Sequence, residues 1–277
     1  MSSPRNNNNA KAITKAIVTL VVAAFVLHAV LHRSGQPMSV SPARVDTPVE
    51  NPIVKALKPP QGVAQRNGIG VAVLIDTSGS MTESVGSSGS ARRPKLAIAQ
   101  ECLAGLAKQM EQYAQQHPDQ RIEVGFYEFS GRGGSAPCRS ILAFGAPNAQ
   151  ALQNAAAKLT ASGDTPIGDA MLQAKQDLDR TGLSHQHILV ITDGENNRGY
   201  ALPDVVTALA NQDPEHRAAM YFVAFDIAGE KFAPVRQAGG TVLHAGNGPE
   251  LRQTLDYVLS GKILAEAPAT PASPAKP

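Results

Sequence analysis

The sequence predicts a doubly wound α/β fold, in which helices flank a mostly parallel central sheet. Residues 69–75 and 187–192 form nearly continuous apolar runs, which are typical of strands buried on both faces. Between and after these runs, strand signals alternate with segments whose apolar residues recur every three or four positions. Strands and helices that alternate at these lengths indicate a parallel sheet with helical connections. About 200 residues carry the pattern, enough for one sizeable core.

The expected elements follow in order after the first strand. Pro94 opens a helix whose apolar residues recur as far as Tyr113, and His117 with Pro118 ends it. The remaining strands are expected at residues 121–129, 140–144, 220–225 and 241–244. The remaining helices are expected at residues 148–159, 167–178, 202–210, 232–237 and 249–261. The strand at 140–144 is short, which is typical of a sheet edge.

Residues 12–31 form an apolar segment of transmembrane length that follows a polar stretch, residues 1–11. Twenty helical residues span about 30 Å, the thickness of the hydrocarbon core, so the segment predicts one membrane-spanning helix. A cleaved signal peptide is the alternative, but no A-x-A cleavage site follows the apolar run. We therefore favour an uncleaved signal anchor.

Basic residues around this segment indicate its orientation. Arg5, Lys11 and Lys15 precede the apolar centre, while Arg33 and Arg44 follow it. Because cytoplasmic flanks carry the excess of Lys and Arg, the N-terminus is expected in the cytoplasm. The rest of this single-pass membrane protein is then expected on the periplasmic or extracellular side.

Composition divides the rest of the chain into a linker, a domain and a tail. Residues 32–61 are rich in Pro, Ser and Val without periodicity, and they predict an extended linker. Residues 263–277 form a Pro/Ala-rich tail that is expected to be disordered. The folded domain is then expected at residues 62–262.

The net charge of +2 conceals an asymmetry between these parts. Residues 1–61 carry seven Lys or Arg against two acidic residues, whereas residues 62–277 carry eighteen against twenty-one. The domain is therefore mildly acidic and contains no basic run, which argues against nucleic-acid binding.

Two cysteines, Cys102 and Cys138, leave two alternatives open: two buried free thiols, or one disulfide in a non-cytosolic compartment. A zinc site is not predicted, because the chain has only these two cysteines and its histidines do not stand at ligand spacing. His185 and His187 flank the start of a strand and could bind a soft metal, although a structural role is the simpler interpretation.

Candidate metal ligands follow the first apolar strand. Asp76, Ser78 and Ser80 place three oxygen-bearing side chains at alternate positions. Ligand sets made only of oxygen suit a hard divalent cation such as Mg²⁺. A surface turn stabilised by Asp and Ser is the alternative interpretation of this segment alone.

Two further segments bring oxygen ligands to the same predicted edge of the sheet. Thr165 precedes a helix, and Asp193 follows the strand that ends at Thr192. Thr165 could instead cap the helix, and Asp193 with Gly194 could form an ordinary turn. Because ligands gather at the carboxyl ends of parallel strands, Asp76 and Asp193 are expected to lie close together.

The three motifs, in this order and on these elements, resemble the von Willebrand factor A (VWA) domain and its metal-ion-dependent adhesion site, over the whole predicted domain. The resemblance implies that Ser78, Ser80 and Thr165 bind Mg²⁺ (or Mn²⁺) directly. It implies further that Asp76 and Asp193 hold ordered waters on the cation. In this family an open coordination position commonly takes an Asp or Glu of a protein partner, so the resemblance implies a metal-dependent adhesion or adaptor domain.

Two other functions remain as alternatives. An aspartate-nucleophile phosphatase also carries an Asp after its first strand, but it needs a second Asp two residues later, where Ser78 stands. The chain has no G-x-S-x-G elbow and no phosphate-binding G-x-x-x-x-G-K-S/T loop, so an enzyme is not expected. A metal-independent envelope scaffold is the other alternative. Bacterial relatives with one N-terminal anchor often act in envelope assembly or surface attachment, which is analogy only.

Overall fold

The computed structural model describes residues 50–86, 91–133 and 136–266. The predicted polar segment (1–11), the predicted membrane anchor (12–31) and most of the predicted tail lie outside these residues. Among the residues described, no helix is both long enough and apolar enough to cross a membrane. The described residues belong to one unit that begins at Glu50.

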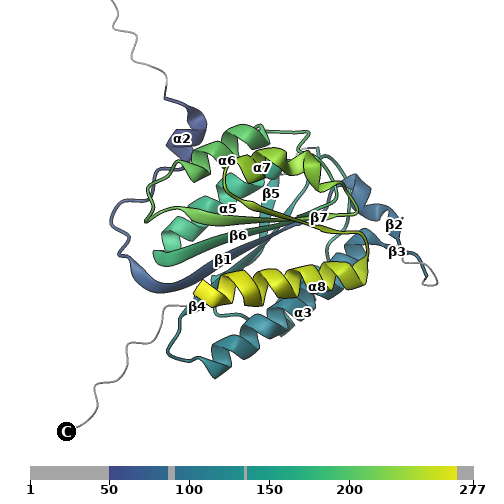
Figure 1. Cartoon of the computed structure of the whole chain (residues 1–277), viewed down its shortest axis with the longest axis horizontal. Coiled ribbons are helices and arrows are strands. Elements are labelled where there is room, and N and C mark those ends of the chain that lie inside the picture. Colours follow the sequence, from purple (N-terminus) through teal and green to yellow (C-terminus); the bar gives the residue numbers. More distant parts are fainter. Residues whose placement is uncertain (1–49, 87–90, 134–135, 267–277) are drawn as a thin grey trace, which may run out of the picture. The chain divides into compact units, whose positions relative to one another are not determined.

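Six strands form the central sheet, in the order β5-β4-β1-β6-β7-β8 (Figure 1). Their bounds are β1 Arg66–Asp76, β4 Ile122–Phe129, β5 Cys138–Gly145, β6 Leu183–Thr192, β7 Ala218–Phe225 and β8 Thr241–Ala245. Neighbouring strands are parallel, except that β4 and β5 are antiparallel. The predicted mostly parallel α/β sheet is therefore confirmed. The strand predicted at 140–144 lies at the sheet edge, as β5, and is longer than predicted.

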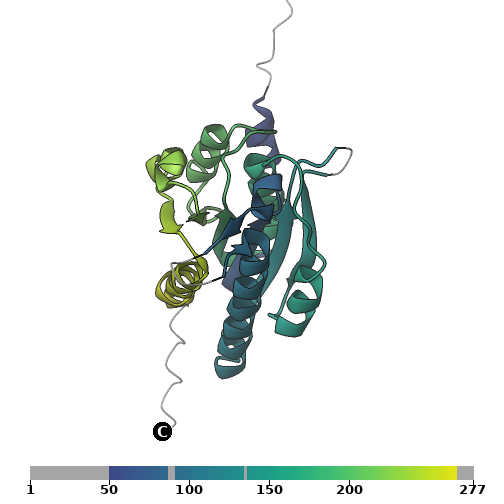
Figure 2. The same cartoon turned by 90° about the vertical axis from the view of Figure 1, so that its right-hand side faces the viewer.

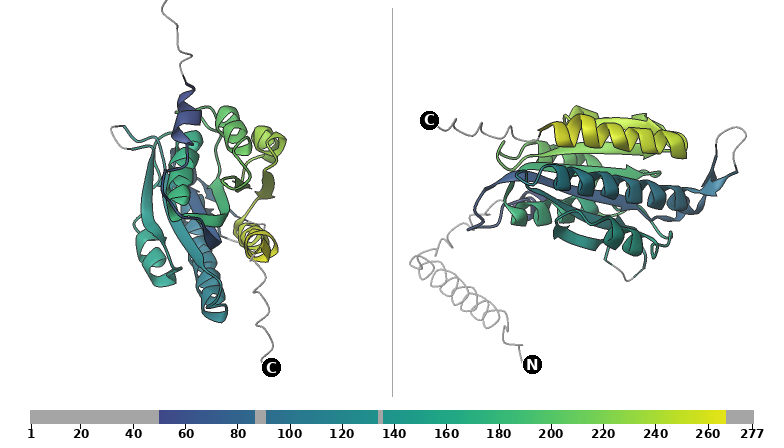
Figure 3. Two further views of the ribbon diagram at one scale, coloured as in Figure 1. Left: turned by 90° about the vertical axis from the view of Figure 1, so that its left-hand side faces the viewer. Right: turned by 90° about the horizontal axis from the view of Figure 1, so that it is seen from below.

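Helices cover both faces of the sheet, as Figures 2 and 3 show from the sides and from below. One face carries α3 (Lys95–Gln116), α4 (Ala149–Ala156) and α8 (Gly248–Val258), and the other carries α5 (Ile167–Thr181), α6 (Leu202–Ala210) and α7 (Ala233–Gln237). Val71, Val73 and Ile75 of β1 face the first core, whereas Ala72 and Leu74 face the second. Burial on both sides explains why β1 is apolar at successive positions.

Short elements lie between the main strands and helices and after α8. The 3₁₀ turn η1 (Gly79–Thr82) and the hairpin of β2 (Ser84–Val85) and β3 (Arg93–Pro94) come after β1, and η2 (Gly229–Phe232) precedes α7. Helix α8 continues into a π-helical turn, η3 (Leu259–Ile263), and a 3₁₀ turn, η4 (Leu264–Glu266). Ile263 is buried in the core, so the domain extends past the predicted boundary at residue 262.

The predicted linker is not extended over its last residues, because α2 (Pro52–Ala56) forms there. The Asn51 side chain accepts a hydrogen bond of 2.9 Å from Ile53 N and caps this helix. Ile53 and Leu57 are buried in the core that α2 shares with α5 and α6. A single turn with two buried apolar residues, Ile53 and the C-cap Leu57, is too short to show helical periodicity in the sequence.

Cys102 and Cys138 are both free thiols. Cys102 is buried in the core beneath α3, whereas the half-buried Cys138 packs against the core on the opposite face. Because the sheet lies between the two sulfurs, they cannot approach to disulfide distance. The alternative of an intramolecular disulfide is therefore wrong.

The strand order reverses at β1. From β1 the chain passes through α3 to β4 on one side, and later through α5 to β6 on the other side. In doubly wound sheets such a reversal opens a crevice at the carboxyl ends of the strands, where ligands bind. Asp76 ends β1 and Thr192 ends β6, so the predicted ligands lie at this switch point.

His187 is fully buried on β6, where its ring stacks on Tyr221 with 6.0 Å between the ring centroids. Within the described part of the chain neither ring nitrogen has a hydrogen-bond partner, and Glu266 Oε2 lies 3.7 Å from Nε2. Burial, together with the charge of His185, lowers the pKa of His187 from 6.5 to about 4. This setting fits the structural role.

We predict that His187 makes the domain less stable in acid. Its pKa in the folded state lies below the unfolded value, so between pH 6.5 and 4 the unfolded chain binds a proton that the folded domain does not. As the pH falls from 6.5 to 4, His187 should therefore lower the free energy of unfolding by about 3 kcal/mol. Urea titrations at several pH values should give a flatter profile for His187→Phe than for wild type.

The exposed His244 supplies the control for this measurement, as His244→Phe. This variant should keep the pH profile of the wild type. An equally steep profile in His187→Phe would show that another group causes the loss of stability in acid.

Candidate metal centre

The pairing of β1 with β6 brings the ends of two predicted motifs together. Ile75 lies opposite Ile191 in the parallel ladder, so Asp76 and Thr192 are neighbours. Thr192 Oγ1 donates a hydrogen bond of 2.6 Å to Asp76 Oδ2. Ser78 N donates one of 2.7 Å to Asp76 Oδ1, so both oxygens of this buried carboxylate are held in place.

Hydroxyl groups connect the loop after β1, which follows Asp76, to the loop after β6. Ser78 Oγ and Ser80 Oγ lie 3.1 Å apart, and Ser80 Oγ donates to Asp193 Oδ1 at 2.7 Å. The turn that presents the serines is η1, whose Met81 is fully buried and anchors it in the core. With Asp76, four of the five predicted ligands are therefore joined in one hydrogen-bonded cluster.

Thr165, the fifth predicted ligand, is buried on a segment that is tied to both of these loops. Gly79 N, in η1, donates to Gly163 O at 2.9 Å, and Thr165 N donates to Asn197 Oδ1 at 2.7 Å. Helix α5 begins after Pro166 without a side-chain cap. The alternative role of Thr165 as the helix cap therefore does not apply.

Gly194 leaves space free beside two of the candidate hydroxyls. A methyl group added at its α-carbon would lie 3.1 Å from Thr165 Oγ1 and 3.8 Å from Ser80 Oγ. Hydroxyls from two different motifs therefore converge on one small volume next to the backbone that follows Asp193. A side chain at position 194 would fill this volume.

Asp76 is a buried carboxylate whose hydrogen-bond donors are neutral. Burial raises its pKa from 3.8 to about 6, hydrogen bonds from Thr192 and Ser78 lower it, and the charge of Asp193 raises it. At neutral pH the carboxylate is therefore ionised at a cost in stability. A positive charge placed beside it would offset that cost.

Lys95, at the start of α3, supplies one positive charge to this edge of the sheet. Its Nζ lies 3.1 Å from Asp193 Oδ2, 3.0 Å from Asp226 Oδ2 and 3.1 Å from Glu83 Oε2. Burial lowers the pKa of Lys95, but its hydrogen bonds to Asp226 and Asp193 outweigh burial and hold the pKa above its ordinary value. The ammonium is therefore charged at neutral pH.

Neither Lys95 nor Asp226 was predicted from the sequence as part of this site. A signal for Lys95 exists, because it lies four positions before Ala99 on the buried face of α3, where an unpaired lysine is costly. Asp226 follows β7 directly, as Asp193 follows β6, so the rule for strand ends would have found it. Its backbone has a φ of 54°, in the left-handed region that Asp adopts more readily than most residues.

The donors gathered here fit a hard divalent cation, because every one is an oxygen and three are hydroxyls. Over residues 50–86, 91–133 and 136–266, no three His, Cys, Asp or Glu side chains form a group that could hold a metal. The hydroxyls are therefore indispensable to a metal site at this place. The assignment of Asp76, Ser78, Ser80, Thr165 and Asp193 as ligands stays a prediction.

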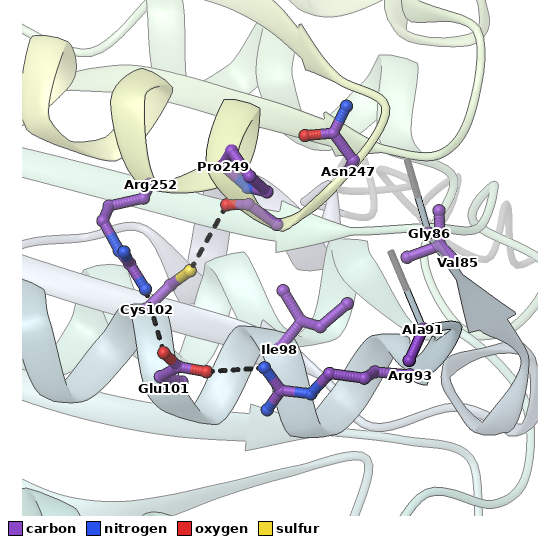
Figure 4. Close-up of a pocket in the computed structure, with 11 residues that line it drawn as sticks. Val85, Gly86, Ala91, Arg93, Ile98, Glu101, Cys102, Asn247, Pro249 and Arg252 are labelled. Carbon is purple, nitrogen blue, oxygen red and sulfur yellow. Dashed lines mark hydrogen bonds and ion pairs between the residues drawn. The ribbon is translucent and has the colours of Figure 1, made fainter. Parts of the chain in front are cut away.

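A pocket of about 250 Å³ lies beside the β2–β3 hairpin, between the starts of α3 and α8 (Figure 4). Glu101 forms ion pairs of 2.9 Å with Arg93 and Arg252 at its wall, and Cys102 Sγ lies 4.0 Å from Gly248 O. None of the five predicted ligands lines the pocket, so it is separate from the candidate metal centre.

Residues 71–195 match the sequence model of the von Willebrand factor type A domain. The match runs from the second half of β1 through the serine-bearing turn and Thr165 to just beyond the end of β6. The fold is that of a VWA domain. The resemblance inferred from the motifs is confirmed to this extent.

Solved structures share this fold at low sequence identity. A von Willebrand factor type A protein from Catenulispora acidiphila has a TM-score of 0.53 and 16% identity, over 69% of this chain and 41% of that one. The PilB minor pilin from Streptococcus sanguinis has a TM-score of 0.52 and 14% identity, over 73% of this chain and 62% of the pilin. The pilus adhesin SpaC from Lactobacillus rhamnosus GG has a TM-score of 0.52 and 16% identity, over 70% of this chain and 31% of the adhesin. At these identities the likeness shows the fold alone.

The chain covers less than two thirds of each of these three proteins, from 31% of the adhesin to 62% of the pilin. The activities of the whole proteins therefore do not carry over with the fold. No curated protein matches the sequence.

We predict that Gly194→Ala weakens Mg²⁺ binding at the candidate centre. The added methyl group would lie 3.1 Å from Thr165 Oγ1, closer than ordinary van der Waals contact, and would displace the hydroxyl. Isothermal titration should give a Kd for Mg²⁺ that is higher than the wild-type value by about tenfold or more.

Gly105→Ala is the matched control for this substitution. Gly105 is exposed on α3, and a methyl group added there meets no neighbouring atom within 4 Å. The control should bind Mg²⁺ as wild type does and gain up to about 1 kcal/mol in stability from the better helix former. A wild-type Kd in Gly194→Ala would show that the space beside Thr165 is not used.

Proposed function

We propose that this VWA domain binds a protein partner through a divalent cation, Mg²⁺ or Mn²⁺, held by Asp76, Ser78, Ser80, Thr165 and Asp193. The observation that supports the proposal is the cluster of hydroxyls and carboxylates at the switch point of the sheet. When bound, such a cation supplies concentrated positive charge and a coordination position for an oxygen ligand from outside the domain.

The donor set favours a carboxylate as that outside ligand. Three of the five donors are neutral hydroxyls, which leave the charge of a divalent cation incompletely compensated. Asp193 already shares its charge with Lys95 at 3.1 Å. An Asp or Glu side chain of a protein partner would complete the compensation, which defines an adhesion or adaptor role.

Binding, rather than catalysis, is the role that we propose for the serines. Ser78 occupies the position at which an aspartate-nucleophile hydrolase or phosphatase requires its second Asp. Ser78 Oγ and Ser80 Oγ hydrogen-bond to each other, and Ser80 Oγ donates to Asp193. The partners of these two hydroxyls are therefore a serine and a carboxylate, rather than the histidine base that activates a serine nucleophile.

The setting that we propose is the cell envelope. Residues 12–31 would anchor the chain with its N-terminus in the cytoplasm and the domain on the periplasmic or extracellular side. Two proteins that share the fold, a minor pilin and a pilus adhesin, are in keeping with a role in surface attachment.

The membrane proposal predicts that the full chain stays in the membrane pellet after carbonate extraction, because an apolar helix of about twenty residues spans the bilayer. A chain without residues 12–31 should move to the supernatant. Protease added to intact spheroplasts should degrade the domain. A full chain recovered in the supernatant would refute the anchor, and a protected domain would refute its orientation.

The metal proposal predicts that Thr165→Ala raises the Kd for Mg²⁺ by about tenfold or more, because one hydroxyl donor is lost. Thr160→Ala is the matched control, since Thr160 is a nearby exposed threonine. Isothermal titration measures both Kd values, and circular dichroism checks that the fold is kept. The metal centre is refuted if wild type gives no Mg²⁺ binding, or if both variants bind alike.

Acetate tests the open coordination position in the same experiment. In the Mn²⁺-loaded domain, acetate should displace a coordinated water and lower the relaxation rate of water protons. No response to acetate would refute the carboxylate ligand. Hydrolysis of p-nitrophenyl phosphate that Asp76→Asn abolishes would instead establish the phosphatase alternative.

A further inference from the structure

Lys95 is held in one position by three acidic side chains. Its ammonium has three N–H donors, and oxygens of Glu83, Asp193 and Asp226 lie 3.0 to 3.1 Å from it. The lysine side chain is only 4% exposed. No donor remains for a ligand, so the ammonium acts as a fixed charge rather than as a recognition group.

The acids around Lys95 come from three loops at the carboxyl edge of the sheet. Glu83 follows η1, Asp193 follows β6 and Asp226 follows β7. Asp226 N also donates a hydrogen bond of 2.8 Å to Ala245 O, at the end of β8. One buried ammonium therefore stands at the junction of the loops that surround the candidate centre.

The two candidate carboxylates differ in the charge that lies beside them. Asp193 is buried, with Oδ2 on Lys95 and Oδ1 on Ser80 Oγ. Asp76 accepts its hydrogen bonds from neutral groups, Ser78 N and Thr192 Oγ1. Lys95 therefore compensates one of the two buried charges and leaves the other uncompensated.

Glu83 and Asp226, the other two acids around Lys95, interact with its ammonium more weakly than Asp193 does. The side chains of Glu83 and Asp226 are 67% and 41% exposed, so water and salt screen their charges. Asp193, with a side chain that is 0% exposed, has no such screening. The strongest interaction of the ammonium is therefore with the carboxylate that belongs to the candidate metal centre.

We infer that Lys95 sets the net charge of the metal centre. It thereby lowers the affinity of the empty centre for the cation and raises the affinity of the loaded centre for the partner's carboxylate. This inference rests on the proposed function. With Lys95 present, a divalent cation meets one uncompensated buried carboxylate, so the loaded centre keeps a positive charge. Without Lys95 the loaded centre would be neutral. The lysine therefore weakens binding of the cation and strengthens binding of an anionic ligand.

A lysine that only holds loops together would behave differently. Its loss would free Asp193 to move, and the cation and the carboxylate would both bind more weakly. Loss of a fixed charge changes the two affinities in opposite directions. The opposite signs separate the two roles.

The experiment measures both affinities in Lys95→Met and Lys95→Gln, two uncharged replacements. Isothermal titration gives the Kd for Mg²⁺, and acetate titration of the Mn²⁺-loaded domain, followed by water-proton relaxation, gives the Kd for acetate. We expect a Kd for Mg²⁺ about tenfold lower than in wild type and a Kd for acetate at least about threefold higher.

Lys175→Met is the matched control, because Lys175 is a second fully buried lysine, on α5, paired with Asp179. This control should leave both Kd values at the wild-type level. It separates the charge at the metal centre from the general effect of removing a buried lysine.

Three outcomes would overturn the inference, and they are distinguishable. If wild type binds both ligands but the Lys95 variants bind Mg²⁺ equally or more weakly, the charge-setting role is wrong and the proposed function stands. If neither variant folds in saturating Mg²⁺, as seen by circular dichroism, the cation cannot replace the lysine and the role is again wrong. If wild type binds neither Mg²⁺ nor Mn²⁺, the proposed function and this inference fall together.

Discussion

The parallel register of β1 against β6 is the constraint on which the candidate centre depends. It sets Asp76 beside Thr192, so that the residues just beyond each strand meet at one point of the sheet edge. Apolar packing on both faces holds this register, because a shift by one residue would turn every side chain of β1 toward the wrong core. The polar cluster is thus positioned by apolar contacts beneath it, and the loops need only supply the donors.

Burial gives the charges at this edge their effect, since the same groups in water would interact far more weakly. Asp193 has an ammonium beside it, whereas Asp76 has only neutral donors and a pKa raised to about 6. An uncompensated buried carboxylate lowers the stability of the fold, and functional sites commonly carry such a cost. The neutral serines between the two carboxylates add oxygen donors without adding to the repulsion.

Local patterns predicted the sheet, most of the helices and the proximity of Asp76 to Asp193, because a strand covered on both faces and the residues at its end are consecutive in the sequence. Lys95 could not be predicted in the same way, since its acidic partners lie in three loops that only the fold brings together. Helix α2 is a single turn, below the length at which periodicity is visible. The state of Cys102 and Cys138 depends on which face of the sheet each one meets, and spacing along the chain does not determine that.

Helix α2 joins the domain at the end of the sheet opposite the candidate centre. The carbonyl group of Ala56, its last residue, accepts a hydrogen bond of 3.0 Å from Gln176 near the end of α5. The carbonyl group of the C-cap, Leu57, accepts one of 3.0 Å from Gln212 just beyond α6. A tether upstream of α2 and a partner held at Asp76 would therefore pull on opposite ends of β1. Such tension runs along the strands and shears their hydrogen bonds together, whereas tension across the sheet would open them one at a time. If the proposed anchor and the proposed partner are both engaged, the load would therefore act along the strands, which is the more resistant direction of the sheet.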